Sequence, residues 1–461
     1  MSDTIAAIAT GNVVSAIGII RISGKIAITA SDNFFRAASG IKLENAENKR
    51  MYYGEFRDLN NYLIDLCLCT VSKAPDSYTG EDTVEFHCHG SPVLLSEILS
   101  ALFSMGIRQA LPGEFSKRAF LNGRMDLTQA EAVIDLIEAE TPVAAQNAAG
   151  QLRGTVRKKI LSVYDRLIDI TAHFHAVIDY PDEDIDEFKI EKYIDMLQSM
   201  NNELQGMLET HDRGKILQTG IPTVIIGRPN TGKSSLLNAL LGYERAIVTD
   251  IAGTTRDTIE EKIITGNVLL RLIDTAGLRK PGDSIEELGV EKTIAALNNA
   301  GLVILVLDGS EPLKSEDYIA LRSIPPDIPK IAVVNKSDLP AALSSGDLCD
   351  LDINYCTISA LSGEGLNVLD EKIQNLFPEF EKTTAHGASA GELLTNTRQA
   401  EAISRASDNI KSAIKALSES LTPDAVLIDI ESALAALGEV TGKTIREDIV
   451  SRIFERFCVG K

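Results

Sequence analysis

Several features that mark other classes of protein are missing from this chain of 461 residues. No apolar run approaches the roughly 18 residues of a membrane-spanning helix, and the longest candidate, AGLVILVLDGS, ends in Asp308 and Gly309 as a buried parallel strand would. The opening residues, MSDTIAAIATGNVV, lack the basic stretch of a secretory signal peptide. With 44% apolar and 24% charged residues, the composition is that of a globular protein, and we expect it in the cytoplasm.

Cysteine is scarce. Six irregularly spaced cysteines do not form a disulfide framework, which agrees with a reducing cytosol. Cys67 and Cys69 alternate along LIDLCLCTV and predict a strand. In EFHCHG, alternation places His87 and His89 on one strand face and Cys88 on the other. No second ligand pair follows at zinc-finger spacing, so a strand is favoured over a metal site.

Basic residues are also few. The chain has 45 lysines and arginines and 66 acidic residues, which gives a net charge of −21. A surface this acidic excludes nucleic-acid binding over its whole area. Any RNA contact needs a local basic patch. RGTVRKK, with Arg153, Arg157, Lys158 and Lys159, is a candidate, although a solvated helix face is the favoured interpretation.

Three kinds of sequence pattern along the chain predict a multidomain α/β protein. Residues 1–122 alternate short β-rich runs with helical patterns, which predicts an α+β domain. Apolar residues at three- and four-residue steps predict helices in 123–218 and again in 383–461. Each helix has an apolar face that it cannot bury alone, so we expect the two sets to pack together as one discontinuous helical domain. Residues 219–382 would then form an inserted domain.

TVIIGRPNTGKSSLLNALLG is the strongest motif. A β-branched run ends at Gly227, and a helix opens at Gly232 and Lys233, which is the context of a P-loop. Backbone N–H groups at such a helix start bind phosphate, while Lys233 would reach the β- and γ-phosphates and Ser234 would bind Mg²⁺. The residues predicted to contact GTP here are Asn230, Thr231, Gly232, Lys233, Ser234 and Ser235.

Four more elements follow in the order found in guanine-nucleotide hydrolases. DIAGTTRD offers the hydroxyls of Thr254 and Thr255 to Mg²⁺, and LLRLIDTAG ends a strand in Asp274, whose carboxylate suits the same ion. Asp338 of NKSD can accept two N–H bonds from guanine, a pair that adenine does not present. TISALSGEG offers Ser359 and Ala360 to the base. The further predicted GTP contacts are Thr249, Thr255, Asp274, Thr275, Ala276, Gly277, Asn335, Lys336, Asp338, Ser359 and Ala360.

The group that activates water is less evident. Leu278 stands where many signalling GTPases have a water-orienting glutamine. Glu286 is a candidate, although the residues alone favour an ordinary exposed glutamate. Arg256 is as suited to a structural ion pair as to catalysis. A monovalent cation could replace an arginine finger, with Asn230 and the TDIAGT backbone supplying oxygen atoms.

These blocks together resemble one family. GRPNTGKSSLLNALL, DIAGTTRD, DTAGLR, NKSD and the terminal FCVGK are similar to the MnmE (TrmE) family of tRNA modification GTPases. IIRISG, YTGEDTVEFHCHG and RQALPGEFSKRAFLNGRMDLTQAEAVIDLI resemble its N-terminal and early helical segments, so the likeness covers the whole chain. The GTPase motifs are shared with ribosome-assembly GTPases, whereas the N-terminal blocks and the tail are more specific.

The resemblance implies an N-terminal folate-binding and dimerisation domain, a discontinuous helical domain and an inserted Ras-like G domain. It implies a homodimer that forms a heterotetramer with an FAD-dependent partner of the MnmG type and acts on tRNA, without a membrane. The product would be a C5 aminomethyl or carboxymethylaminomethyl group on the wobble uridine. A tetrahydrofolate, 5-formyltetrahydrofolate or a relative, would supply the one-carbon unit, and K⁺ would stimulate GTP hydrolysis.

The resemblance also implies roles for single residues. Glu286 would be catalytic in GTP hydrolysis, and Cys458 would belong to the modification site. Arg124 stands where the family commonly has lysine, which keeps the charge and changes the shape of the contact. The implied ligand sets are Ser234 and Thr255 for Mg²⁺; Asn230, Thr249, Ile251 and Thr254 for K⁺; and Arg21, Glu81, Arg124 and Lys461 for folate.

The chain ends in Cys458, Val459, Gly460 and Lys461, the length of a prenylation box. Gly460 and Lys461 do not fit its aliphatic pattern, so we interpret the tail as part of a site, held by the periodic helix before it. Two other functions compete with this interpretation. A ribosome-assembly GTPase that binds rRNA usually appends an RNA-binding module, whereas helices follow the G domain here. A dynamin-type mechanical G protein would need a membrane-binding segment, and the sequence shows none.

Overall fold

The computed structural model describes residues 3–179, 190–243, 261–273, 296–378, 391–444, 447–455 and 457–460. The chain divides into two compact units. The first comprises residues 1–134, 156–201 and 401–461, and the second comprises residues 135–155 and 202–400. The predicted helical segments therefore contribute to both units, and the boundaries of the three expected domains stay a prediction.

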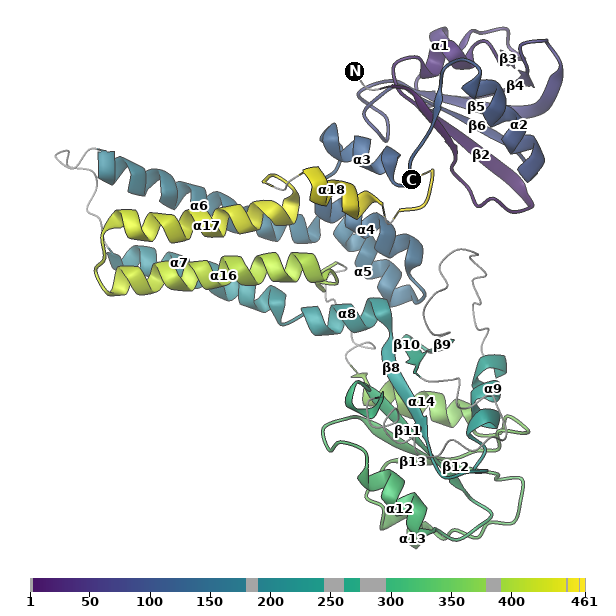
Figure 1. Cartoon of the computed structure of the whole chain (residues 1–461), viewed down its shortest axis with the longest axis vertical. Coiled ribbons are helices and arrows are strands. Elements are labelled where there is room, and N and C mark those ends of the chain that lie inside the picture. Colours follow the sequence, from purple (N-terminus) through teal and green to yellow (C-terminus); the bar gives the residue numbers. More distant parts are fainter. Residues whose placement is uncertain are drawn as a thin grey trace. The chain divides into compact units, whose positions relative to one another are not determined.

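The first unit contains a seven-stranded sheet in the order β3-β4-β5-β6-β2-β1-β7, in which only β1 and β7 pair in parallel (Figure 1). One face of the sheet packs against the core, and Cys67, Cys69 and Cys88 are buried on it. His87 and His89 lie on the other face, as expected. The strands are β1 (Ile5–Ile8), β2 (Ser15–Ser23), β3 (Phe35–Ala37), β4 (Met51–Arg57), β5 (Leu63–Ser72), β6 (Thr83–Gly90) and β7 (Arg108–Gln109). Short helices accompany them: α1 (Ala27–Ser31), the 3-10 helix η1 (Leu43–Asn45), α2 (Pro92–Phe103) and α3 (Glu114–Leu121).

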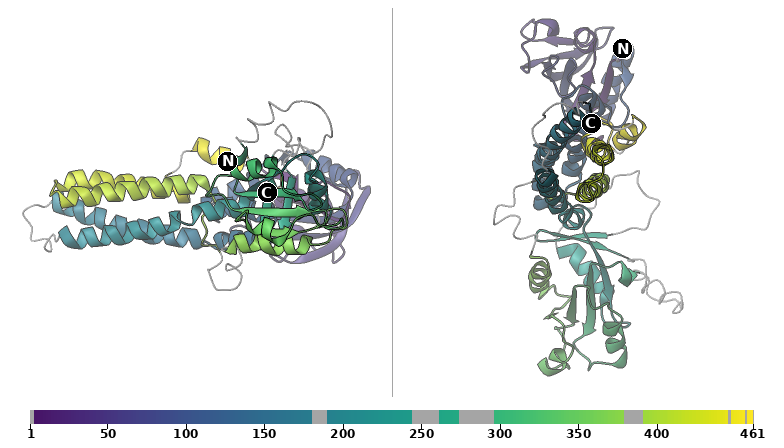
Figure 2. Two further views of the ribbon diagram at one scale, coloured as in Figure 1. Left: turned by 90° about the horizontal axis from the view of Figure 1, so that it is seen from below. Right: turned by 90° about the vertical axis from the view of Figure 1, so that its left-hand side faces the viewer.

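Long helices complete the first unit (Figures 1 and 2). His175 of α6 lies 3.3 Å from Glu431 of α17, and Ser407 of α16 donates a hydrogen bond of 2.6 Å to Asn201 of α7. Helices before and after the inserted segment therefore pack together, which confirms the discontinuous helical fold. The helices are α4 (Leu127–Glu138), α6 (Thr155–Asp179), α7 (Ile190–Leu208), α16 (Thr397–Ser418), α17 (Pro423–Thr441) and α18 (Glu447–Phe454). Of these, α4, α6, α7 and α16 each have residues of the second unit at one end.

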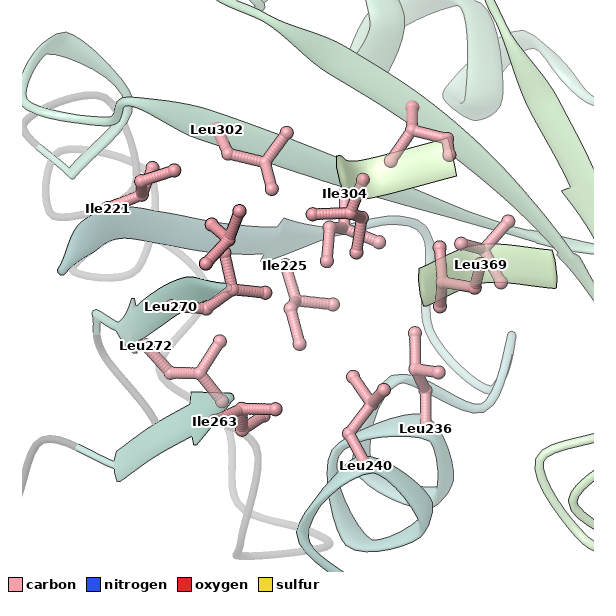
Figure 3. Packing of buried hydrophobic residues seen from close by; sticks show 14 of the residues in the cluster. Ile221, Ile225, Leu236, Leu240, Ile263, Leu270, Leu272, Leu302, Ile304 and Leu369 are labelled. Atoms are coloured by element: carbon pink, nitrogen blue, oxygen red, sulfur yellow. The ribbon is translucent and has the colours of Figure 1, made fainter. Parts of the chain in front are cut away.

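The second unit contains a six-stranded sheet in the order β13-β12-β11-β8-β10-β9, parallel except for the pair β9–β10. All seven residues of β11 are buried because both faces of the sheet are covered, and Figure 3 shows the core on one face. The strands are β8 (Ile221–Ile226), β9 (Glu261–Thr265), β10 (Val268–Leu272), β11 (Leu302–Asp308), β12 (Lys330–Asn335) and β13 (Tyr355–Thr357). The helices are α5 (Pro142–Leu152), α8 (His211–Thr219), α9 (Lys233–Tyr243), α12 (Ser315–Arg322), α13 (Ser345–Cys349) and α14 (Leu366–Leu376).

The carboxyl ends of the parallel strands bring the nucleotide motifs to one edge of this sheet. The loop after β8 carries the P-loop, β12 ends in Asn335, and Ser359 follows β13. Ligands bind at this edge in open α/β sheets. Among the described residues, no helix is both long and apolar enough to span a membrane.

Candidate functional sites

Three residues with positive φ shape the P-loop between β8 and α9. Gly227 has φ of 148° and Gly232 has φ of 96°, and a Cβ atom on either would collide with Val306 O or Asn335 Nδ2 respectively. Asn230 adopts φ of 64°, which asparagine tolerates better than most residues. Glycine is therefore required on both sides of the loop, where the backbone passes close to its neighbours.

Lys233 points back into this loop. Its Nζ donates hydrogen bonds of 2.8 Å to Gly227 O and to Arg228 O. Burial lowers the pKa of Lys233 because the loop removes water from the ammonium group. Thr231 is fully buried and donates to Arg228 O at 3.1 Å, so the loop is closed on itself around the ammonium group.

Asn335 links the P-loop to the segment after β13. Its Nδ2 donates to Thr231 O at 2.9 Å, and its Oδ1 accepts from the Ala360 N–H at 2.9 Å. Asp338 is exposed, and its Oδ1 accepts from Ser359 Oγ at 2.6 Å. These contacts bring the two predicted base-binding segments, NKSD and SAL, together beside the P-loop.

Lys336 of the same motif forms an ion pair that the sequence motifs did not predict. Its Nζ lies 2.6 Å from Asp308 Oδ2, at the end of β11. Burial alone would raise the pKa of Asp308, but hydrogen bonds from Lys336 and Ser310 outweigh it, so that pKa lies below its ordinary value. The signal that could have found Asp308 is its place at the carboxyl end of an apolar strand.

The N-terminal site is built around Arg21 on β2. Its Nε lies 2.6 Å from Glu85 Oε1 on the paired strand β6. Its guanidinium lies 5.3 Å from the ring centroid of Tyr78 and 5.6 Å from that of Phe115, within the range of cation–π contacts. Its Nη1 also donates to Gly460 O at 3.4 Å. Arg21 therefore contacts the C-terminal tail and two aromatic rings at once.

Glu81 and Arg124 lie on neighbouring loops. Ser23, on the strand that carries Arg21, donates to Glu81 Oε2 at 2.8 Å. The Arg124 side chain passes Gly80, where a Cβ atom would lie 3.3 Å from Arg124 Cγ. Asn122 Nδ2 donates to Thr79 O at 2.7 Å and joins the two loops. The structure thus brings Glu81 and Arg124 to the end of β2.

The C-terminal tail lies against the same region. Val459 forms a bridge with Pro112, and Gly113 donates to Cys458 O at 3.3 Å. Gly460 has φ of 101°, and a Cβ atom there would collide with Ile8 O. The Cys458 side chain is exposed beside these anchored residues. The tail as far as Gly460 is therefore packed against the N-terminal sheet region, and its part in a site stays a prediction.

Comparison with known proteins covers almost the whole chain. Residues 4–124 match the family model described as the GTP-binding protein TrmE N-terminus, and residues 127–458 match the MnmE helical domain. The tRNA modification GTPases MnmE of Clostridioides difficile (strain 630) and of Carboxydothermus hydrogenoformans are 40% and 41% identical to it, over 100% of each pair of chains. This chain belongs to the MnmE family. The predicted resemblance is confirmed, and so is the predicted activity, that of a GTP hydrolase of tRNA modification.

Among solved structures, the G domain of the FeoB iron transporter of T. maritima is 26% identical to part of this MnmE-family chain. It covers 33% of this chain and 96% of its own, with a TM-score of 0.26. That score is too low for the likeness to decide anything about function.

Part of the predicted nucleotide site falls outside the described residues, so its contacts stay predictions. Ser234 and Ser235 are described and lie exposed at the start of α9, and Asn230 is exposed in the loop before it. Lys461, the fourth residue predicted to contact folate, also lies outside the described residues. The other predicted residues outside the described ranges are Thr249, Ile251, Thr254, Thr255, Asp274, Thr275, Ala276, Gly277 and Glu286.

Proposed function

We propose that this MnmE-family chain is a potassium-stimulated GTPase of wobble-uridine modification. As a cytoplasmic homodimer, in a heterotetramer with an FAD-dependent partner of the MnmG type, it would add an aminomethyl or carboxymethylaminomethyl group to C5 of the wobble uridine in tRNA. The observation that carries the proposal is the contact of Arg21 with the tail. It links a predicted folate residue to the segment that bears Cys458.

The nucleotide residues take the following roles. Lys233 binds the β- and γ-phosphates, for which it exchanges its two carbonyl contacts in the loop. Asp338, held by Ser359, accepts the N1–H and 2-amino hydrogens of guanine, and the Ala360 backbone lies beside it. Asn335 and Lys336 belong with Asp338 to the base-binding segment NKSD. The remaining predicted contacts belong to the phosphate and ion sites: Asn230, Thr231, Gly232, Ser234, Ser235, Thr249, Thr255, Asp274, Thr275, Ala276 and Gly277.

Two ions fit the oxygen atoms at this site. Mg²⁺ would be bound by the hydroxyls of Ser234 and Thr255, since hard oxygen atoms are its preferred ligands. K⁺ would be bound by Asn230, Thr249, Ile251 and Thr254, and Asn230 is an exposed residue of the loop. Glu286 would orient the attacking water.

The N-terminal residues fit a reduced folate. Arg21, Arg124 and Lys461 are cations that suit the carboxylates of its glutamate moiety, and the Glu81 carboxylate suits the amino group and ring N–H of its pterin. A bound 5-formyltetrahydrofolate or related tetrahydrofolate would supply the one-carbon unit. Cys458, exposed on the anchored tail, is positioned by the contacts of Val459 and Gly460.

The domain boundaries belong to the same proposal. Residues 1–122 would bind folate and dimerise, residues 219–382 would bind GTP, and residues 123–218 with 383–461 would form the helical domain between them. The packing of α6 on α17 and of α7 on α16 supports the last assignment.

The test is a nucleoside analysis. The gene is deleted in its host, total tRNA is digested, and the nucleosides are measured by mass spectrometry. We expect the C5 aminomethyl-type wobble uridines to disappear, to return with the wild-type gene, and to stay absent with a Cys458→Ser copy. Unchanged uridines in the deletion strain would refute the function. Equal GTP turnover in potassium and sodium would refute the stimulation alone.

A further inference from the structure

Glu81 belongs to a cluster of five charged side chains that includes two arginines, Arg108 and Arg118. Arg118 on α3 is only 7% exposed. Its Nη1 donates to Asp3 O at 2.7 Å and to Glu81 Oε2 at 3.0 Å, and its Nη2 donates to Asp3 Oδ1 at 2.8 Å and Glu114 Oε1 at 3.0 Å. One buried guanidinium therefore joins the segment before β1, helix α3 and the Glu81 loop.

Arg108 shares most of these partners. It lies 2.6 Å from Asp3 Oδ2 and 2.6 Å from Glu114 Oε1. Unlike Arg118, it has no contact with Glu81 among the described residues, and it is more exposed, at 40% of its side chain. The chain therefore offers two arginines that make the same links to Asp3 and Glu114, of which one also binds Glu81.

The two oxygens of Glu81 are occupied unequally. Oε2 accepts from Ser23 Oγ at 2.8 Å and from Arg118 Nη1 at 3.0 Å. Oε1 has one longer contact within the described residues, 3.4 Å to Arg118 Nη1. A carboxylate oxygen can accept two hydrogen bonds, so Oε1 keeps acceptor capacity while Oε2 fixes the orientation of the group.

We propose that Arg118 is a positioning residue that aims Glu81 Oε1 at the 2-amino group and adjacent ring N–H of a pterin. This inference rests on the proposed folate function. Pterins present those two donors side by side, so a single carboxylate oxygen can accept from both only when it is aimed between them. Arg118 and Ser23 set that angle by binding Oε2 from two sides.

The network is suited to this role because its carboxylates compensate for the burial of the Arg118 charge. Burial alone would lower the pKa of Arg118, but its hydrogen bonds to Glu114 and Glu81 outweigh burial and raise it. The guanidinium thus stays charged and keeps its planar fork at a fixed place. Lysine at this position would keep the charge but could not make the same set of parallel contacts.

The experiment compares Arg118→Met with its matched control, Arg108→Met, in the full-length chain. Affinity for 5-formyltetrahydrofolate is measured by calorimetry, and again for the analogue in which hydrogen replaces the 2-amino group. We expect Arg118→Met to bind 5-formyltetrahydrofolate about tenfold more weakly, the usual effect of losing a charged hydrogen bond, and Arg108→Met to change it less than about twofold. The preference for the 2-amino compound should fall in Arg118→Met alone.

A double substitution separates positioning from a general loss of structure. In a Glu81→Gln background, Arg118→Met should cause little further loss, because the group that Arg118 positions is already altered. If Arg118→Met does not fold by circular dichroism, Arg118→Lys gives the same comparison.

Three outcomes would overturn the inference. In the first, the Arg118 variants bind 5-formyltetrahydrofolate as tightly as the wild type. In the second, their affinities for 5-formyltetrahydrofolate and for the analogue without the 2-amino group fall by the same factor. Neither of these results would contradict the proposed folate function. If the wild type itself binds no 5-formyltetrahydrofolate, the proposed folate function fails and this inference fails with it.

Discussion

Asp338 in the G domain and Glu81 in the N-terminal domain are proposed to recognise the same pattern, an amino group beside a ring N–H. Each carboxylate accepts a hydrogen bond from a serine, Ser359 at 2.6 Å and Ser23 at 2.8 Å. Beyond this they differ. Asp338 is exposed, whereas the Glu81 side chain is 14% exposed and is bound by Arg118 as well.

The difference lies in how each recognition loop is held. In the nucleotide site, Asn335 connects backbone groups of two loops at the edge of a parallel sheet. In the N-terminal site, an ionic network of side chains holds the Glu81 loop beside a sheet that is mostly antiparallel. Asp338 therefore lies on a loop that a neutral asparagine side chain holds through backbone groups, whereas the Glu81 carboxylate is itself bound by a buried arginine.

The largest effect is expected at the base of the nucleotide site. Asp338→Asn replaces an acceptor oxygen with an amide donor, which opposes the 2-amino group of guanine and suits the 2-oxo group of xanthine. We expect GTP affinity to fall by about 100-fold or more, since a site built for hydrogen bonding rejects a mismatched partner strongly. Competition between fluorescent GDP and XDP measures the change. Retained guanine preference would show that Asp338 is not the recognition group.

Breaking the Asn335 connection tests the first half of the comparison. Asn335→Ala removes two side-chain hydrogen bonds, which together contribute about 2 kcal/mol, so nucleotide release should accelerate by about thirtyfold. Stopped-flow release of fluorescent GDP measures it, and Ser344→Ala, which removes a helix cap outside the site, is the control. Unaltered release would mean that the loops are held by other contacts.

A further test of the N-terminal site concerns the tail, which Arg21 contacts. Gly460→Ala places a side chain where φ is 101° and where Ile8 O blocks it. A left-handed alanine costs about 1–2 kcal/mol, so docking of the tail, and with it uridine modification, should fall by about tenfold. GTP turnover should not change. Gly106→Ala is the matched control, because Gly106 has φ of 80° but open space around it; equal losses in both variants would contradict the docking role.

The same comparison explains what could be predicted from sequence. The nucleotide site was found because its parts are short contiguous motifs at strand ends, and the apolar stripe of α6, including Ile160 and Phe174, gave the helical packing. The Arg118 network was not found, because Asp3 and Arg118 are 115 positions apart. Arg118 stands in the block RQALPGEFSKRAFLNGRMDLTQAEAVIDLI, but the block does not show which distant acidic side chains it binds. Contacts between distant charged side chains depend on the tertiary arrangement, which no local pattern encodes.

The smallest effect concerns acid. Hydrogen bonds from Arg108, ahead of those from Arg118, hold the pKa of Asp3 at about 2 instead of 3.8. Because the unfolded chain takes up this proton first, Asp3 stabilises the fold above pH 3.8, and that contribution is lost as the pH falls from 3.8 toward 2. The carboxylate is 54% exposed, so solvent screens it and the contribution is small. The midpoint temperature of thermal unfolding should therefore fall less steeply with decreasing pH for Asp3→Asn than for the wild type. Parallel plots of this temperature against pH would show that the network does not depend on Asp3.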